Sequence, residues 1–266
     1  MDRPSASPLA VVTGASSGIG LALARQFAEH GYDLVIAAEE AAIHAAAGDL
    51  RATGRHVDSV QVDLARPDGA DQLWDRALAL GRPVDAVVIN AGVALNGAFS
   101  DTDLAAEVNL IELNITSSVR LAKRAVRDMV ARGEGRILIT SSIAAEAPGP
   151  YTALYSASKA FLLSFGEAIR YELKDRGVTV TVLQPGATDT NIIERSGMED
   201  TKLGVGPKLS ADEVAKTGFD ALMAGKDHVV AASLKEKVMV AVGQVLPDAV
   251  KAGPQADMVR PGSGTA

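Results

Sequence analysis

The chain of 266 residues contains no cysteine, which excludes disulfide bonds, thiolate metal sites and a cysteine nucleophile. A cysteine-free chain fits a reducing compartment, so we expect a cytoplasmic protein. Positive charge is also scarce, because 26 Lys and Arg face 33 Asp and Glu and the formal net charge is -7. A broad nucleic-acid surface needs clustered Lys and Arg, and no nucleic-acid partner is therefore expected.

Long apolar runs and metal-ligand patterns are missing as well. No apolar run approaches the roughly 18 residues of a membrane span. The opening MDRPSASPLAVVTG lacks the apolar core of a secretion signal. The four histidines show no ligand spacing; they are His30, His44, His56 and His228. We expect no membrane contact and no metal site.

Strand-like and helix-like segments alternate along the chain. The predicted strands cover residues 9–14, 33–38, 57–64, 84–92, 136–142, 178–186 and 228–233. The predicted helices cover residues 20–31, 39–54, 68–80, 103–132, 152–175, 210–223 and 234–246. Such alternation is typical of an α/β, doubly wound Rossmann fold, with a parallel sheet of about seven strands and helices on both faces. No change of composition indicates a linker, so residues 1–266 are predicted to form a single domain.

Two segments depart from this alternation. Residues 187–209 show no periodicity and are too long for an ordinary connection, which predicts a mobile lid or a binding loop. The loop ends where Ser210 and Glu213 form a capping-box pattern that opens the next helix. Residues from about 250 to 266, ending RPGSGTA, are expected to form a frayed, flexible tail.

The stretch TGASSGIG, residues 13–20, lies between the first strand and the first helix. Gly14 permits a tight turn, Gly18 lets the backbone approach a ligand, and Gly20 lets the helix pack closely on the strand. A helix N-terminus in this context favours a pyrophosphate. The predicted contacts here are Gly14, Ser16, Ser17, Gly18, Ile19 and Gly20. A glycine turn without a ligand is the alternative.

Glu39 stands 19 residues after Gly20, at the end of the second predicted strand. A carboxylate at this place accepts hydrogen bonds from the adenosine ribose and repels a 2'-phosphate, so NAD is predicted rather than NADP. The alternative is that Glu39 and Glu40 only favour the start of a helix. Further cofactor contacts are expected at the ends of the third and fourth strands; they are Asp63, Leu64, Asn90, Ala91 and Gly92.

In LYSASKAF, residues 154–161, Tyr155 precedes Lys159 by four positions, about one helical turn. Taken alone, this spacing is more often a surface helix pair than a working acid and base. Together with TGASSGIG, NAG (residues 90–92), Ser142 and PGATDT (residues 185–190), however, the chain resembles the single-domain short-chain dehydrogenases/reductases. The resemblance covers residues 11 to about 190 and is weaker as far as 232.

The resemblance implies a role for each matched residue. Tyr155 would donate and accept the proton, Lys159 would stabilise it electrostatically and bind the nicotinamide ribose, and Ser142 would hydrogen-bond the substrate oxygen. Asn114 matches the asparagine that holds a water beside the lysine, although Asn109 lies nearby in the sequence. The turn after the sixth strand would close over the nicotinamide; its matched residues are Pro185, Gly186, Thr188 and Thr190.

The expected activity is hydride transfer between NAD(H) and a secondary alcohol or ketone. An NADP(H)-dependent ketone or 3-oxoacyl reductase is the nearest alternative, and a catalytically silent dinucleotide-binding regulator is the alternative of a different class. An apolar or aromatic carbonyl compound is expected as the substrate, because the predicted pocket lining is apolar. That lining comprises Ala94, Leu95, Ile143, Ala144, Pro148, Ala187, Ile192 and Met198. The resemblance also implies a homodimer or homotetramer.

Overall fold

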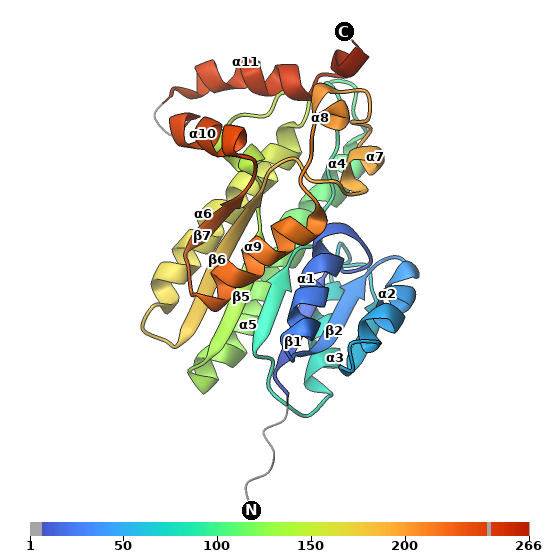
Figure 1. Cartoon of the computed structure of the whole chain (residues 1–266), viewed down its shortest axis with the longest axis vertical. Helices are drawn as coiled ribbons and strands as arrows, with labels where there is room; N and C mark the ends of the chain where they lie inside the picture. Colours follow the sequence, from blue (N-terminus) through green and yellow to red (C-terminus); the bar gives the residue numbers. More distant parts are fainter. Residues whose placement is uncertain (1–6, 244–245, 266) are drawn as a thin grey trace, which may run out of the picture.

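The computed structural model describes residues 7–243 and 246–265 and contains one seven-stranded parallel sheet (Figure 1). The strand order is β3-β2-β1-β4-β5-β6-β7, which confirms the predicted doubly wound fold. The strands are β1 (Leu9–Thr13), β2 (Asp33–Ala38), β3 (Val57–Gln61), β4 (Ala86–Ile89), β5 (Gly135–Thr140), β6 (Val178–Pro185) and β7 (His228–Ala231). The order reverses between β1 and β4, and sheets of this kind bind ligands beyond the carboxyl ends of the strands at that point.

Helices cover both faces of the sheet because the central strands are apolar on both sides. Along β1, Ala10 and Val12 face one core cluster, whereas Leu9 and Val11 face the other. The first cluster is covered by α1 (Gly18–Glu29), α2 (Ala42–Arg51) and α9 (Ala211–Met223). The second is covered by α3 (Gly69–Leu78), α5 (Ser117–Arg132) and α6 (Ala153–Leu173).

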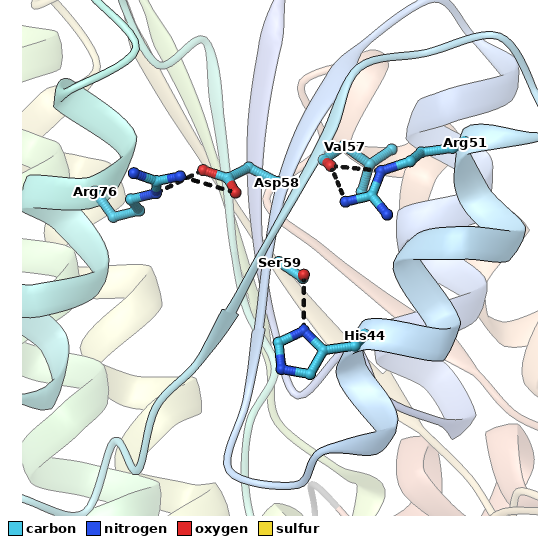
Figure 2. A network of polar contacts seen from close by, with 6 residues as sticks. All are labelled: His44, Arg51, Val57, Asp58, Ser59 and Arg76. Carbon is cyan, nitrogen blue, oxygen red and sulfur yellow. Dashed lines mark hydrogen bonds and ion pairs between the residues drawn. The ribbon is translucent and has the colours of Figure 1, made fainter.

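The edge strand β3 is fastened to the helices on either side by polar contacts (Figure 2). Arg76 of α3 binds Asp58 through two hydrogen bonds of 2.7 and 3.2 Å. On the other side, both Nε and Nη2 of Arg51 donate to the carbonyl of Val57. These contacts fix an edge that has few apolar side chains of its own.

One long helix was predicted over residues 103–132, and the structure divides it in three. α4 (Leu104–Ile111) and α5 are joined by η1 (Glu112–Thr116), a turn of π-helix. A π-turn inserts one extra residue into a helix and so rotates the side chains that follow it. The residues of η1, ELNIT, are compatible with an ordinary α-helix, so the sequence pattern does not reveal the insertion.

The carboxyl ends of the strands are covered by short and late helices (Figure 1). Within the predicted loop 187–209 the structure contains α7 (Ile192–Arg195) and α8 (Lys202–Val205). The last predicted helix begins as expected, as α10 (Leu234–Gly243), and its predicted end falls partly on residues 244–245, outside the described residues. A short η2 (Ile143–Glu146) follows β5.

The prediction of a frayed tail from about residue 250 is wrong for the described residues. The segment forms α11 (Asp248–Val259) and η3 (Ser263–Thr265). Ala256 and Val259 are buried, with 8 % and 2 % of their surface exposed, so this helix has an apolar side that packs on the rest of the chain. Residue 266, the end of the predicted tail, lies outside the described residues.

Candidate active site

The glycine turn between β1 and α1 has the backbone that its sequence demands. Gly14 and Gly18 adopt φ angles of +65° and +55°, a region that glycine enters without steric cost. A side chain on Gly20 would collide with the carbonyl oxygen of Gly14 and with Nδ2 of Asn90. The three glycines therefore allow the turn to fold tightly against β4.

Thr13 and Asn90 lock the turn to the end of β4. The Thr13 hydroxyl donates to the carbonyl of Val88 and accepts from the backbone amides of Asn90 and Ala91. The Asn90 amide group donates in return to the Thr13 carbonyl at 3.1 Å. Asn90, a predicted cofactor contact, therefore stabilises the glycine turn through its hydrogen bonds with Thr13.

The turn fits a pyrophosphate on the evidence of its own backbone. In the described part of the chain, the Ser17 side chain makes no capping hydrogen bond to the amides in the first turn of α1. A side chain on Gly18 would lie 3.1 Å from the Thr190 methyl group, which places Thr190 directly beside the turn. Free amides at the positive end of a helix dipole are suited to a phosphate anion.

Two predicted adenosine contacts lie just past neighbouring strand ends. Glu39 follows β2 directly, and its side chain is exposed while its carbonyl accepts from the Gln61 amide group at 3.0 Å. Asp63 follows β3, and its Oδ1 accepts from the backbone amide of Ala65 at 2.8 Å. One oxygen of Asp63 is therefore used in a local turn, whereas the Glu39 carboxylate faces outward.

Ser142, Tyr155 and Lys159 come together at the carboxyl end of β5. Ser142 follows the strand, and its hydroxyl accepts from the amide of Ala144 at 3.1 Å. Tyr155 and Lys159 lie one turn apart on α6, with the ammonium 5.7 Å from the centre of the tyrosine ring. Lys159 is 5 % exposed, and its Nζ donates to the carbonyl of Thr140 at 3.0 Å.

The environment of this group changes its acid–base properties. Burial raises the pKa of Tyr155 above its ordinary value of 10.0, and a hydrogen bond with Ser142 partly offsets this rise. Burial lowers the pKa of Lys159 from 10.5 to about 8. At neutral pH the tyrosine is a phenol and most of the lysine remains an ammonium, a pairing suited to donating a proton.

Asn114 lies in the π-turn η1 and is fully buried. Its Nδ2 donates to the Val93 carbonyl and to the Ser158 hydroxyl, while its Oδ1 accepts from the Val93 amide. A side chain on Gly92 would stand 3.0 Å from Asn114 Oδ1 and 3.6 Å from Lys159 Nζ. Asn114 therefore joins the segment after β4 to α6 and lies close to Lys159.

The segment after β6 contacts α10 and the residues at the predicted adenosine end of the site. The Thr188 hydroxyl donates to the Gly186 carbonyl at 2.9 Å, and the amide of Ala187 donates to Glu236 of α10. Further along, Arg195 of α7 forms an ion pair of 2.6 Å with Glu40. The segment that begins after Pro185 thus reaches from α10 to the adenosine end of the predicted cofactor site.

Part of the predicted apolar lining gathers next to Tyr155. Ala94 and Met198 are buried together with Val259, and Tyr151, Tyr155, Ile192, Ile193 and Leu203 pack against them. We call these residues the distal cluster. The other predicted lining residues are not members of this cluster: Leu95, Ile143, Ala144 and Ala187 are half-buried, whereas Pro148 is exposed.

A family model described as short chain dehydrogenase matches residues 8–200. The chain belongs to the short chain dehydrogenases. Among its relatives, 1-deoxy-11-beta-hydroxypentalenate dehydrogenase from Streptomyces exfoliatus is 35% identical over 80% of this chain and 78% of its own. The ketoacyl reductase HetN from Nostoc is 28% identical over 90% of this chain and 85% of its own.

A solved short-chain dehydrogenase from Sphingobium yanoikuyae, in complex with NADPH, has the same fold. It shares 29% identity with this chain, covers 95% of it and 97% of its own length, and has a TM-score of 0.80. This short chain dehydrogenase is accordingly an NAD(P)-dependent oxidoreductase that acts on alcohols and ketones.

Sequence reasoning missed several residues that hold the short chain dehydrogenase site in place. The Ser141 hydroxyl donates to the Lys159 carbonyl at 2.7 Å, and the Ser158 hydroxyl donates to the Tyr155 carbonyl at 2.7 Å. Both serines adjoin a predicted site residue, which is the only signal that the sequence offers. Asn96 also adjoins a predicted residue, Leu95, but its partner, the carbonyl of the last residue of α11, is 163 residues away and has no local signal.

Metal-ligand clusters and membrane-spanning helices are both absent from the part of the chain that the structure describes. Across residues 7–243 and 246–265, no three His, Asp or Glu side chains gather as metal ligands would. None of the described helices has the length and apolar character needed to cross a membrane.

Proposed function

We propose that this short chain dehydrogenase transfers a hydride between NAD(H) and a secondary alcohol or ketone whose substituents are apolar or aromatic. The observation that carries the proposal is the meeting of Ser142, Tyr155 and Lys159 beside the distal cluster. An acid, a hydrogen-bond donor and a cation then surround one point, and apolar side chains border it.

In the direction of reduction, the Tyr155 hydroxyl donates its proton to the substrate oxygen. Ser142 supplies a positioned hydrogen bond to the charge that develops on that oxygen. Ser142 follows β5 and Tyr155 lies in the first turn of α6, so two rigid elements fix the distance between the two hydroxyls. In the direction of oxidation the same groups act in reverse, and Tyr155 receives the proton.

Lys159 favours the charged form of Tyr155. Its ammonium is held on the Thr140 carbonyl and lies over the tyrosine ring. A cation one turn away lowers the energy of the phenolate that remains after proton donation. Because the pKa of Lys159 is about 8, this cation is present at neutral pH and is lost as the pH rises further.

The dinucleotide, when bound, supplies or accepts the hydride. The glycine turn would hold its pyrophosphate, Glu39 its adenosine ribose, and Lys159 its nicotinamide ribose. Asp63, Leu64 and the residues Ala91 and Gly92 would border the adenine and the adjoining ribose. Thr188 and Thr190 would cover the nicotinamide end.

The direct test is to follow reduced-nicotinamide absorbance with a panel of aryl and alkyl ketones, and with the matching alcohols in the other direction. NADH and NADPH are compared in parallel at the same concentration. Turnover of at least one apolar ketone with NADH is the expected result. If both dinucleotides bind but no carbonyl or alcohol is turned over, the chain is instead a silent dinucleotide-binding protein.

Exchanging Glu39 for serine is expected to shift cofactor preference toward NADPH. The change removes a carboxylate that would lie close to a 2'-phosphate, and at least 1.4 kcal/mol of repulsion corresponds to about a tenfold change. The measurement is the ratio of kcat/KM for NADPH to that for NADH. Asp49→Ser, which removes an exposed carboxylate from α2, is the control and should leave the ratio unchanged. An equal ratio in both variants would show that Glu39 does not contact the ribose.

An NADP(H)-dependent ketone or 3-oxoacyl reductase is the second candidate. The solved Sphingobium relative is a complex with NADPH, and the Nostoc relative is named a ketoacyl reductase. The exposed Glu39 favours NAD over this candidate. The same assay separates the two candidate functions. A strong preference of the parent protein for NADPH would contradict the hypothesis that Glu39 repels a 2'-phosphate.

We also propose a cytoplasmic homo-oligomer assembled through α4, α5 and α6. Large apolar side chains are exposed on α4 and α6, which flank α5 in the sequence: Leu104 is 71% exposed, and Val108, Ile111, Phe161 and Tyr171 are exposed as well. Light scattering at two protein concentrations measures the assembly, and a monomer at both would contradict it.

A further inference from the structure

The last helix of the chain lies over the site. Val259, at the end of α11, is 2% exposed and belongs to the distal cluster, which also contains Tyr155. Figure 1 shows α11 crossing above α10 and α8, at the end of the molecule where the strands terminate. A segment that lies far away in the sequence thus supplies an apolar wall beside the reacting group.

Side-chain hydrogen bonds attach α11 near both of its ends. Near its start, Lys251 Nζ donates to the carbonyl of Glu146 at 2.8 Å, in the turn that follows Ser142. At its other end, Asn96 Nδ2 donates to the carbonyl of Val259 at 2.8 Å. The helix therefore spans the space between the segment after β5 and the segment after β4.

The residues after α11 are fastened to the substrate loop. The amides of Gly262 and Gly264 donate to Asp200, at 2.9 Å to the carboxylate and 2.8 Å to the carbonyl. The Lys202 amide donates back to the Ser263 hydroxyl at 3.0 Å. A side chain on Gly264 would lie only 2.8 Å from the Thr201 carbonyl oxygen, so the two segments are in close contact.

Tyr151 adds a strained residue to the same wall. It is the non-glycine residue with a positive φ, +65°, among those the structure describes. Its carbonyl accepts from the Gly97 amide at 2.8 Å, and the Arg260 guanidinium lies 5.8 Å from its ring. A side chain held in this region costs of order 1 kcal/mol and persists only where its surroundings fix it.

We propose that α11 and η3 form the outer wall of the substrate pocket, and that Val259 sets the size of substrate that the pocket accepts. This proposal rests on the proposed function. Because Val259 and Met198 already pack beside Tyr155, the pocket suits compact apolar ketones and alcohols, and each added methylene must displace the wall.

Shortening Val259 to alanine is expected to increase the size of the substrate that the pocket accepts. The measurement is kcat/KM for phenyl alkyl ketones that lengthen by one methylene at a time. A methylene in an apolar pocket is worth roughly 10-fold or more in kcat/KM. Val259→Ala should therefore raise the ratio of the longer ketone to the shortest one by about tenfold.

Two matched variants separate size selection from a general loss of packing. Val250→Ala makes the same change on the same helix at a side chain that is 54% exposed, and its ratio should equal that of the parent. Val259→Thr keeps the shape of valine, so the size ratio should stay unchanged even if the melting temperature falls. An equal ratio in Val259→Ala and Val250→Ala would overturn the proposal.

The wall is also tested without turnover, so that it can fail separately from the proposed function. If the parent protein reduces no ketone, the proposed function fails. Whether Val259 forms part of the pocket wall is then tested by the binding of anilinonaphthalene sulfonate to the cofactor-free protein. Val259→Ala is expected to bind this apolar dye several-fold more tightly than Val250→Ala at a temperature where both are folded. Equal dye affinity would remove Val259 from the wall.

Discussion

Exchanging Tyr155 for phenylalanine is expected to lower kcat about a thousandfold. The ring and its packing against the distal cluster remain, but the hydroxyl that would transfer the proton is lost. Proton transfer by a positioned side chain contributes typically 10²- to 10⁴-fold to the rate. Steady-state kinetics with the best ketone of the panel give kcat. A dissociation constant for the dinucleotide that changes less than a few-fold shows that the site is intact.

Tyr171→Phe is the matched control for this variant. It removes the same hydroxyl from the same helix, α6, at a side chain that is 71% exposed. Its kcat should equal that of the parent. If Tyr155→Phe retained more than about a tenth of the parent kcat, the proton would have to come from another group, and the assignment of Tyr155 would be abandoned.

Exchanging Lys159 for methionine is expected to abolish turnover while making the cofactor-free protein more stable at pH 7. The side chain is 5% exposed, and its pKa of about 8 instead of 10.5 means that burying the ammonium costs about 3 kcal/mol. Methionine fills similar space without charge, although it leaves the Thr140 carbonyl without the bond from Nζ. A net gain of about 1–3 kcal/mol in the free energy of unfolding should therefore appear in denaturant titrations.

The gain has a defined pH dependence. Below pH 8 the lysine is protonated in both the folded and the unfolded chain, and the full cost of burial is present. Between pH 8 and 10.5 the folded chain loses this proton while the unfolded chain keeps it, so the parent becomes more stable relative to the variant. The difference should shrink across that window. Lys123→Met, at an exposed position of α5, should show neither the gain in the free energy of unfolding nor its change between pH 8 and 10.5. A Lys159→Met variant less stable than the parent at pH 7 would contradict the burial cost.

The sequence predicts well those parts of the fold and site that depend on local patterns. The seven strands follow from short apolar runs such as residues 9–13, and the capping box of Ser210 and Glu213 marks the start of α9. The glycine turn is predictable because its residues are adjacent in the chain. The spacing of Tyr155 and Lys159 likewise places both on one face of α6.

Features that depend on distant partners could not be predicted. Residues 248–259 contain Gly253 and Pro254, both poor helix formers, and α11 is held instead by Asn96 and Glu146. The π-turn around Asn114 escapes notice for another reason, because its residues, ELNIT, are compatible with an ordinary helix. Its extra residue is fixed by the bonds of Asn114 to Val93 and Ser158.

Because η3 is attached to Asp200, the two termini of the chain differ in how well they would tolerate a fusion. The amino end of β1 lies at the end of the molecule opposite α11 (Figure 1). An affinity tag, a fluorescent protein or a surface linker added before β1 would therefore stand clear of the pocket. The same addition after η3 would lie beside the residues that bind Asp200. A bulky fusion there would weaken these hydrogen bonds and displace α11 and η3 from the pocket.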